Sequence, residues 1–302
     1  MLEGACVLRL DTCCKSYRVG AFGSTEVAAV RNVSFEVRPG EVVALVGESG
    51  SGKSTIGKMI LRLLRVTEGT ISYDGTDIAT LEHQALKRYY ADVQGVFQDS
   101  FSSYNPIFKA DRVFTMLRGA YFPEARDEEW RAKVERALEA VSLNADDVLN
   151  KYPHQLSGGQ LQRLLIARAL LLDIRLLVAD EIISMLDAST RIDVLNLLGD
   201  LKARGLAILF ITHDLSLANY ISDTTMILRR GEIVEIGATP LVYGNPTHSY
   251  TRALMASVPQ LHRSWDEAEA ALAAGSAAHV SGENGSRLVE VEDEHLVAPE
   301  RA

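Results

Sequence analysis

The chain has 302 residues, of which 47% are hydrophobic and 24% are charged, so it can fill the core of one large domain or of two modest ones. Its formal net charge of −9 argues against a protein that coats nucleic acid, and its three cysteines form no paired framework of the kind that secreted domains carry. No run approaches ~18 uninterrupted apolar residues and the start lacks the basic region of a secretion signal, so we expect a soluble chain in a reducing cytoplasm.

The N-terminal part of the chain has the pattern of strands around one glycine-rich loop. Residues 32–37 alternate apolar and polar side chains, which favours a strand with one buried face. Residues 41–46 are continuously apolar from Val42 onward, as expected for a strand that is covered on both faces. Residues 69–78 predict a small strand pair around an Asp-Gly turn, and residues 93–98 predict another short strand.

The glycine-rich loop reads GESGSGKST and matches the pattern G-x-x-x-x-G-K-[ST] between a buried strand and a helix. Its glycines let backbone N–H groups turn inward and cradle phosphate oxygens, which a Cβ would obstruct. Lys53 can reach the β- and γ-phosphates, the Ser54 hydroxyl can complete a Mg²⁺ shell, and the helix that opens at Ser54 adds its positive dipole end. The predicted ATP-binding loop consists of Gly47, Glu48, Ser49, Gly50, Ser51, Gly52, Lys53, Ser54 and Thr55.

Between residues 100 and 170 the sequence no longer shows the patterns that predict strands. Residues 128–143 space Trp130, Val134 and Leu138 at the intervals of an amphipathic helix. This stretch therefore predicts a helical insertion.

Alternation of strands and helices resumes after this insertion. Residues 175–180 predict a strand, residues 188–203 a helix with Ser189 or Thr190 near its N-cap, and residues 206–212 a further strand. Such alternation favours a parallel α/β sheet.

Two carboxylates, Asp180 and Glu181, stand side by side at the end of the strand at 175–180. Adjacent acids at the end of a buried strand are electrostatically unfavourable unless something cationic or reactive lies opposite them. In P-loop proteins an acid at the end of a neighbouring strand holds Mg²⁺ through water, and we expect this role for Asp180. Glu181 is then placed to polarise the attacking water as a general base.

The motif LSGGQ at residues 156–160 supplies a second phosphate grip. Ser157 and the backbone of Gly158 and Gly159 can donate to phosphate oxygens, and the helix that starts near Gln160 directs its dipole toward them. Two grips on one chain seldom face the same nucleotide unless two chains meet, so the motif points to a dimer.

In these motifs, roughly residues 5–260 resemble the ATP-binding cassette ATPases. In that family two cassettes form a head-to-tail dimer, with ATP between one phosphate loop and the partner's signature. The resemblance implies an α/β fold with a P-loop NTPase (RecA-like) core, an N-terminal antiparallel β-subdomain and an inserted α-helical subdomain at roughly 100–170. It also implies ATP and Mg²⁺ as ligands and ATP hydrolysis as the activity.

The family pattern assigns roles to further residues. Gln98, at the end of GVFQ, matches the glutamine that contacts Mg²⁺ and senses the γ-phosphate, His213 matches the switch histidine, and Asp187 matches the aspartate that communicates across the dimer. Tyr17 is the candidate for the aromatic side chain that stacks on adenine, with Phe22 as its competitor. The implied catalytic residues are Glu181, His213 and Lys53, the implied Mg²⁺ ligands are Ser54, Gln98 and (through water) Asp180, and the implied signature is Ser157, Gly158, Gly159 and Gln160.

The chain departs from the family after the catalytic glutamate, where it reads IISMLD in place of the usual Pro-Thr and of the Ala before Leu-Asp. Asp180, Glu181, Leu186 and Asp187 are intact, so hydrolysis is expected to survive. The missing proline predicts a looser loop at Ile182.

Residues 96–106 and 244–259 resemble the ATPase subunits of oligopeptide and dipeptide importers, a group that also serves nickel and oligosaccharide importers. Many members carry a cysteine cluster after this ending, but no cysteine follows Cys14 here, so no iron–sulfur cluster is expected. The expected organisation is an ATPase domain at 1–260 with an importer-type element at 245–260, followed by an acidic, disordered tail at 261–302.

The resemblance also implies partners and a location. They are two transmembrane permease subunits, a second cassette of the same or a paralogous chain and, indirectly, a solute-binding protein, without nucleic acid. The chain would lie peripherally on the inner face of the cell membrane. The alternative is a soluble accessory ATPase of an enzyme complex that resembles carbon–phosphorus lyase.

Overall fold

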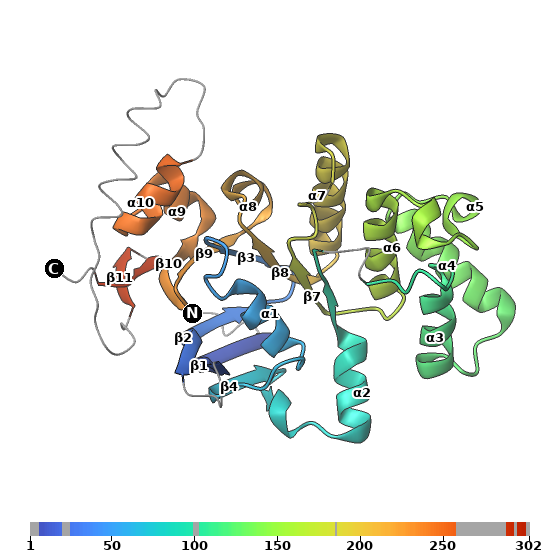
Figure 1. Ribbon diagram of the computed structural model, residues 1–302, viewed down its shortest axis with the longest axis horizontal. Coiled ribbons are helices and arrows are strands. Elements are labelled where there is room, and N and C mark those ends of the chain that lie inside the picture. The colour runs from blue at the N-terminus through green and yellow to red at the C-terminus, as the bar shows by residue number, and fades with distance from the viewer. Residues whose placement is uncertain are drawn as a thin grey trace. The chain divides into compact units, whose positions relative to one another are not determined.

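The computed structural model describes residues 6–19, 25–98, 103–184, 186–257, 288–292 and 295–299 of the chain. The chain divides into two compact units, each of which is described by itself (Figure 1). Unit 1 comprises Met1–Thr80 and Leu209–Ala302, and unit 2 comprises Leu81–Ile208.

Unit 1 contains an antiparallel sheet with the strand order β2-β1-β4-β5. The strands are β1 (Leu8–Val19), β2 (Thr25–Val37), β4 (Glu68–Tyr73) and β5 (Thr76–Asp77), and a 3-10 turn at Ile78–Thr80 follows. The turn between β4 and β5 lies at Asp74 and Gly75, as the Asp-Gly pair predicts. This sheet confirms the predicted N-terminal antiparallel β-subdomain.

Unit 1 also contains strands of a larger sheet in the order β11-β12-β10-β9-β3-β8. All five residues of β3 are buried, and β3 pairs in parallel with β9, as its continuously apolar sequence predicts. These strands are β3 (Val42–Val46), β8 (Ala207–Thr212), β9 (Thr224–Arg229), β10 (Glu232–Ala238), β11 (Val289–Glu292) and β12 (His295–Val297). The helices of the unit are α1 (Lys53–Ile60), α8 (Leu215–Ile221), α9 (Thr239–Gly244) and α10 (Ser249–Ala256).

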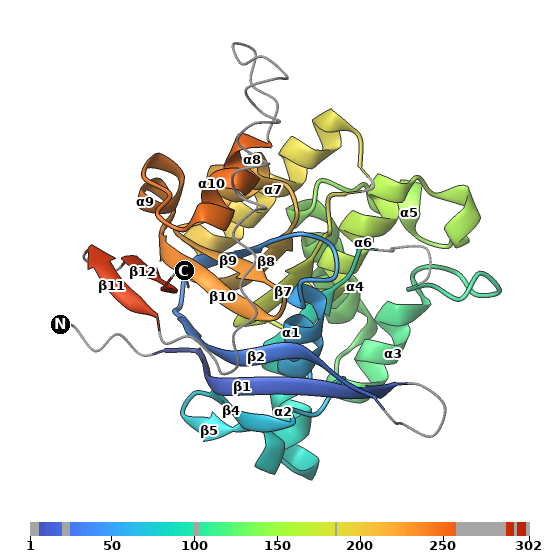
Figure 2. The ribbon, with the colours of Figure 1, turned by 60° about the vertical axis from the view of Figure 1, so that its left-hand side comes forward.

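The prediction of a disordered tail is wrong for residues 288–292 and 295–299. Here β11 and β12 pair with each other, and β12 extends the sheet by pairing with β10, as Figure 2 shows. The acid-rich composition of the tail conceals a short apolar stretch whose Val297 and Ala298 are buried, and the Ala298 amide donates to the Val234 carbonyl at 2.8 Å. Residues 258–287, which include the end of the importer-type element, lie outside the described residues.

Unit 2 combines two parallel strands with helices. Strands β6 (Val93–Val96) and β7 (Leu176–Asp180) pair in parallel, and the start of β8 joins them through the Ala207 amide, which donates to the Arg175 carbonyl at 3.1 Å. The amphipathic pattern at residues 128–143 forms α4, which buries Trp130, Val134 and Leu138 as predicted. The helices of this unit are α2 (His83–Asp92), α3 (Arg112–Tyr121), α4 (Asp127–Ala140), α5 (Ala145–Val148), a 3-10 turn (Pro153–Gln155), α6 (Gly158–Leu170) and α7 (Ala188–Ala203).

Candidate nucleotide-binding site

The phosphate loop runs between β3 and α1 in unit 1 and is supported closely from behind. A Cβ at Gly47 would lie 2.2 Å from the Leu228 carbonyl oxygen, so only glycine fits there. Gly52 has a φ of +109° and a Cβ there would lie 2.4 Å from the Ala29 oxygen. The loop therefore has the backbone path and the tight support that a phosphate cradle needs.

Lys53 begins helix α1 and is buried, with only 4% of its surface exposed. Its Nζ donates to the carbonyl oxygens of Gly47 at 2.7 Å and Glu48 at 2.8 Å. The ammonium group is thus held over the loop by backbone oxygens, and a phosphate placed there would offer it a charged acceptor in their stead. Ser54 and Thr55 follow in the first turn of α1 and are half-buried.

Two further predicted site residues belong to unit 1. His213 directly follows β8, the neighbour of β3 in the sheet, and its side chain is exposed. Tyr17 lies on β1, is half-buried, and has the Lys15 ammonium 5.3 Å from its ring centroid. Phe22, the alternative adenine-stacking residue, lies outside the described residues.

In unit 2 the parallel register of β6 and β7 brings three predicted residues to one sheet edge. Val96 pairs with Ala179, so the carboxyl ends of both strands lie at the same edge. Gln98 follows β6 there and is exposed, whereas Asp180 ends β7 with 5% exposure. Glu181 comes next, which gives this edge one amide and two carboxylates.

The turn after Glu181 is closed, although the proline of related cassettes is absent. The Ser184 amide and hydroxyl both donate to the Glu181 carbonyl, at 3.2 and 2.9 Å, and the side chains of Ile182 and Ile183 are 1% and 2% exposed. These contacts fix the turn from Glu181 to Ser184, and the effect of the missing proline on the loop stays a prediction. Glu181 itself has a φ of +51°, a conformation that costs about 1 kcal/mol or more for a residue other than glycine and that is common at functional sites.

The signature motif forms the start of helix α6. The Ser157 hydroxyl accepts the Gln160 amide at 3.1 Å and the Gln160 side chain accepts the Ser157 amide at 2.9 Å, which is a capping box. A Cβ at Gly159 would lie 3.0 Å from the Thr190 methyl group of α7. The signature thus leaves the N-terminal amides of α6 and the hydroxyl proton of Ser157 able to donate to an anion.

Asp187 is the N-cap of helix α7, and Ser189 and Thr190 lie near this cap, as predicted. Its carboxylate accepts from the Thr190 amide at 3.0 Å and from the hydroxyls of Ser189 at 2.6 Å and Thr190 at 2.8 Å. These donors hold the pKa of Asp187 well below its usual range, the Ser189 bond most of all. The two hydroxyls donate to the Asp187 carboxylate, and this carboxylate, not a hydroxyl, accepts the Thr190 amide at the start of the helix.

Replacing Asp187 by alanine is expected to lower the melting temperature, because the first turn of α7 loses its cap. Since the folded-state pKa is lowered, the stabilisation is present above the unfolded-state pKa of about 4 and is lost as the pH falls through the folded-state value. Thermal unfolding of wild type and variant between pH 7 and pH 3 checks this, and the difference should narrow below about pH 4. A difference that grows toward acid pH would contradict the assignment.

Sequence reasoning missed Arg168, which connects the signature helix to the segment before Gln98. Its Nη2 donates to the Gly95 carbonyl in β6 at 2.9 Å, and burial lowers its pKa. The Tyr104 hydroxyl donates to the Leu161 carbonyl of the same helix at 3.4 Å. The segments before and after Gln98 are therefore each hydrogen-bonded to α6. In the sequence, the feature that hints at this contact is an arginine within an apolar run of that helix.

Comparison with known proteins decides the family. A family model described as ABC transporter matches residues 30–184. The chain belongs to the ABC transporter family. A protein of Brucella ovis that is provisionally named a peptide import ATP-binding protein is 44% identical over 238 residues, which are 78% of this chain and 74% of that relative. The oligopeptide transport ATP-binding protein OppF of Streptococcus mutans is 42% identical over 238 residues, with 78% and 77% covered.

A solved structure of an ABC cassette supports the same membership. It is a dimeric ATP-binding cassette in a post-hydrolysis state with bound ADP and Pi, 30% identical, with a TM-score of 0.69 over 77% of this chain and 98% of that chain. The predicted resemblance, the P-loop NTPase fold class and the ATPase activity are thereby confirmed. Among the described residues of this chain, no helix is long and apolar enough to cross a bilayer.

Proposed function

We propose that this chain is the ATP-hydrolysing subunit of an ABC importer for peptides. The observation that carries the proposal is the 40–44% identity to relatives named for peptide, oligopeptide and dipeptide import, over 78–86% of this chain. Oligosaccharides and nickel remain alternative cargoes of this importer group, since selectivity resides in the permease and the solute-binding protein.

The arrangement within each unit supports a division of labour around ATP. In unit 1 the phosphate loop cradles the phosphates, with Lys53 on the β- and γ-phosphates, Tyr17 under the adenine and His213 toward the γ-phosphate. The Lys53 ammonium already stands over the loop, bonded to its carbonyl oxygens. Binding therefore requires an exchange of acceptors at this ammonium, and no unfolding of the loop.

In unit 2 the proposed catalytic groups stand together at the edge of β6 and β7. Glu181 takes the proton of the attacking water as general base. The oxygens of Gln98 and Asp180 are hard donors of the kind that Mg²⁺ prefers, with Asp180 acting through water. Bound Mg²⁺ would neutralise negative charge on the phosphates.

We further propose that a second cassette, of the same or a paralogous chain, completes each ATP site through its signature. Ser157, Gly158, Gly159 and Gln160 then grip the partner's ATP, and Asp187 communicates across the dimer. A Cβ at Gly159 would approach Thr190, which donates to Asp187, so a shift at the signature reaches this aspartate through one side chain.

The permease is the proposed partner on unit 2. After Gln98, Ile107 and Met116 are 75% and 64% exposed, which is apolar surface of the kind that protein interfaces cover. Two permease subunits on the inner face of the cell membrane would cover it, and they connect the cassette indirectly to a solute-binding protein.

Purification of the tagged chain from native membranes in mild detergent tests this proposal. Two polytopic proteins, alone or with a second cassette, are expected to copurify in stoichiometric amounts and to be identified by mass spectrometry. A Met116→Lys, Ile107→Lys variant should lose them while keeping its ATPase activity. Copurification of water-soluble enzyme subunits without membrane proteins would contradict the importer and favour the accessory ATPase.

A further inference from the structure

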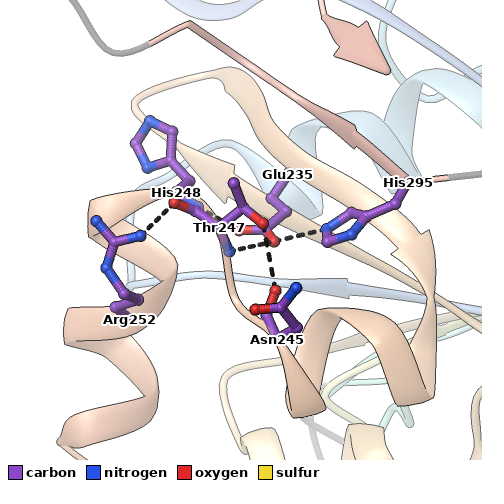
Figure 3. Close-up of polar contacts among 6 residues, drawn as sticks. All are labelled: Glu235, Asn245, Thr247, His248, Arg252 and His295. Atoms are coloured by element: carbon purple, nitrogen blue, oxygen red, sulfur yellow. Dashed lines mark hydrogen bonds and ion pairs between the residues drawn. The ribbon is translucent and has the colours of Figure 1, made fainter. Parts of the chain in front are cut away.

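A buried carboxylate holds the start of the importer-type C-terminal helix α10. Glu235 in β10 is 0% exposed, and its oxygens accept the amides of Thr247 at 2.9 Å and His248 at 3.0 Å, as Figure 3 shows. His295 of β12, also 0% exposed, places its Nε2 2.8 Å from the same carboxylate. A buried charge requires such partners, so this cluster joins β10, the turn before α10 and the C-terminal strand β12 into one unit.

The turn that Glu235 holds continues directly into helix α10. The His248 side chain caps the helix by accepting the Tyr250 amide at 3.0 Å, and the Arg252 side chain donates back to the Thr247 carbonyl. Hydrogen bonds to the backbone of Thr247, His248 and Tyr250 therefore fix the path of this turn. The sequence NPTHSY, which the importer resemblance singles out, supplies these groups.

Tyr250 is the residue that this turn places beside the phosphate loop. It belongs to the buried apolar cluster that also contains Ala44 and Val46 of β3, the strand that leads into the loop, and Ala298 of the C-terminal strand segment. The Arg229 guanidinium lies 4.8 Å from the ring centroid. Burial, together with the negative charge of Glu48 in the phosphate loop, raises the pKa of the Tyr250 phenol to about 12.

Arg229 ends strand β9 and directly precedes the turn that supports the phosphate loop from behind. The Gly231 amide in this turn donates to the Ser51 carbonyl at 2.8 Å. The carbonyl of Leu228, next to Arg229, is the group that a Cβ at Gly47 would strike. The end of β9 and the turn that follows it therefore contact the phosphate loop at two points, Gly47 and Ser51.

We infer that Tyr250 is a positioning residue for the phosphate loop, which it holds in its ATP-binding shape through Arg229, while the Glu235–His295 cluster fixes Tyr250. This role rests on the proposed assignment of residues 47–55 as the ATP phosphate cradle. It gives the importer-type C-terminal element and the C-terminal strand a function in nucleotide affinity.

The test compares ATP binding and turnover in three full-length variants. Tyr250→Leu removes the aromatic face and should raise the KM for ATP and the Kd for a fluorescent ATP analogue by about 3- to 30-fold, the range of one desolvated cation–π contact. The kcat at saturating ATP should stay within about twofold, because the catalytic groups are untouched. Tyr250→Phe keeps the ring over Arg229 and should restore the wild-type KM.

Met255→Ala is the matched control, because Met255 lies on the same helix and packs against the same apolar cluster but has no aromatic ring for Arg229 to stack on. It should lower the melting temperature and leave the KM unchanged. If Tyr250→Leu does not fold, Arg229→Gln removes the same contact from the other side.

Three results would overturn the inference: an unchanged KM in Tyr250→Leu, an equal rise in Met255→Ala, or no rescue by Tyr250→Phe. Lys53→Ala in the same assays distinguishes a failure of the phosphate-loop assignment from a failure of the positioning role of Tyr250. If Lys53→Ala binds ATP normally, the phosphate-loop assignment itself is wrong. If Lys53→Ala loses affinity and Tyr250→Leu does not, only the positioning role fails.

Discussion

Replacement of Glu181 by glutamine is expected to lower the rate of ATP hydrolysis by about 10²- to 10⁴-fold, the range that a general base contributes. Glutamine keeps the size of the side chain but cannot accept the proton of the attacking water. ATP affinity should stay near the wild-type value, because the residues proposed to bind the phosphates, 47–55, are unchanged. Phosphate release under saturating ATP measures the rate, and equilibrium binding of a fluorescent ATP analogue measures the affinity.

The matched control is Glu135→Gln, which neutralises an exposed carboxylate of α4 in the same unit. It should turn over ATP at the wild-type rate. A Glu181→Gln rate within tenfold of wild type would remove Glu181 from the role of base. The turn from Glu181 to Ser184 is fixed by the hydrogen bond from the Ser184 hydroxyl to the Glu181 backbone carbonyl and by the burial of Ile182 and Ile183. None of these contacts uses the Glu181 carboxylate, so the turn should keep its geometry in the variant.

Replacement of Lys53 by alanine is expected to weaken ATP binding by about 10- to 100-fold, since a hydrogen bond to a charged group contributes about 1.5–3 kcal/mol. The ammonium group also bridges the carbonyls of Gly47 and Glu48, so its loss leaves the loop without its internal tie. Isothermal titration with ATP and Mg²⁺ measures the affinity, and circular dichroism checks the fold.

Lys58→Ala is the control for this substitution, because Lys58 lies on the same helix, is exposed and sits in the last turn. It changes the net charge of the chain by the same amount. Equal affinity losses in both variants would mean that general charge, and not a specific contact, attracts the nucleotide. Wild-type affinity in Lys53→Ala would contradict the phosphate-loop assignment.

The local elements of the site follow from short-range physics and were predicted from the sequence. A continuously apolar run followed by a glycine-rich loop can form little other than a buried strand and a phosphate cradle, and β3 and α1 have this form. The same holds for LSGGQ, whose Ser157 and Gln160 cap their own helix over three residues. The sequence placed Ser189 or Thr190 near the N-cap of α7, and only the backbone geometry shows that Asp187 is the cap itself.

The acid-rich C-terminal segment illustrates the limit of composition. Its average character predicts disorder, yet His295 finds Glu235, sixty residues earlier in the chain, and Val297 extends the sheet on β10. No local pattern announces such a pair, because a buried carboxylate is stable only when donors from distant segments reach it. The same reason hides the stacking of Arg229 on Tyr250.

By itself, the sequence determined the ATPase family and the fold class, and it led to the proposed phosphate, magnesium and base residues, because these depend on residue types at fixed short spacings. The tertiary structure alone decided how the turn after Glu181 closes without proline, which residue caps α7, and that the importer-type helix and the C-terminal strand converge on the turn behind the phosphate loop. These features depend on burial and on hydrogen bonds between residues far apart in the chain, which no local pattern encodes.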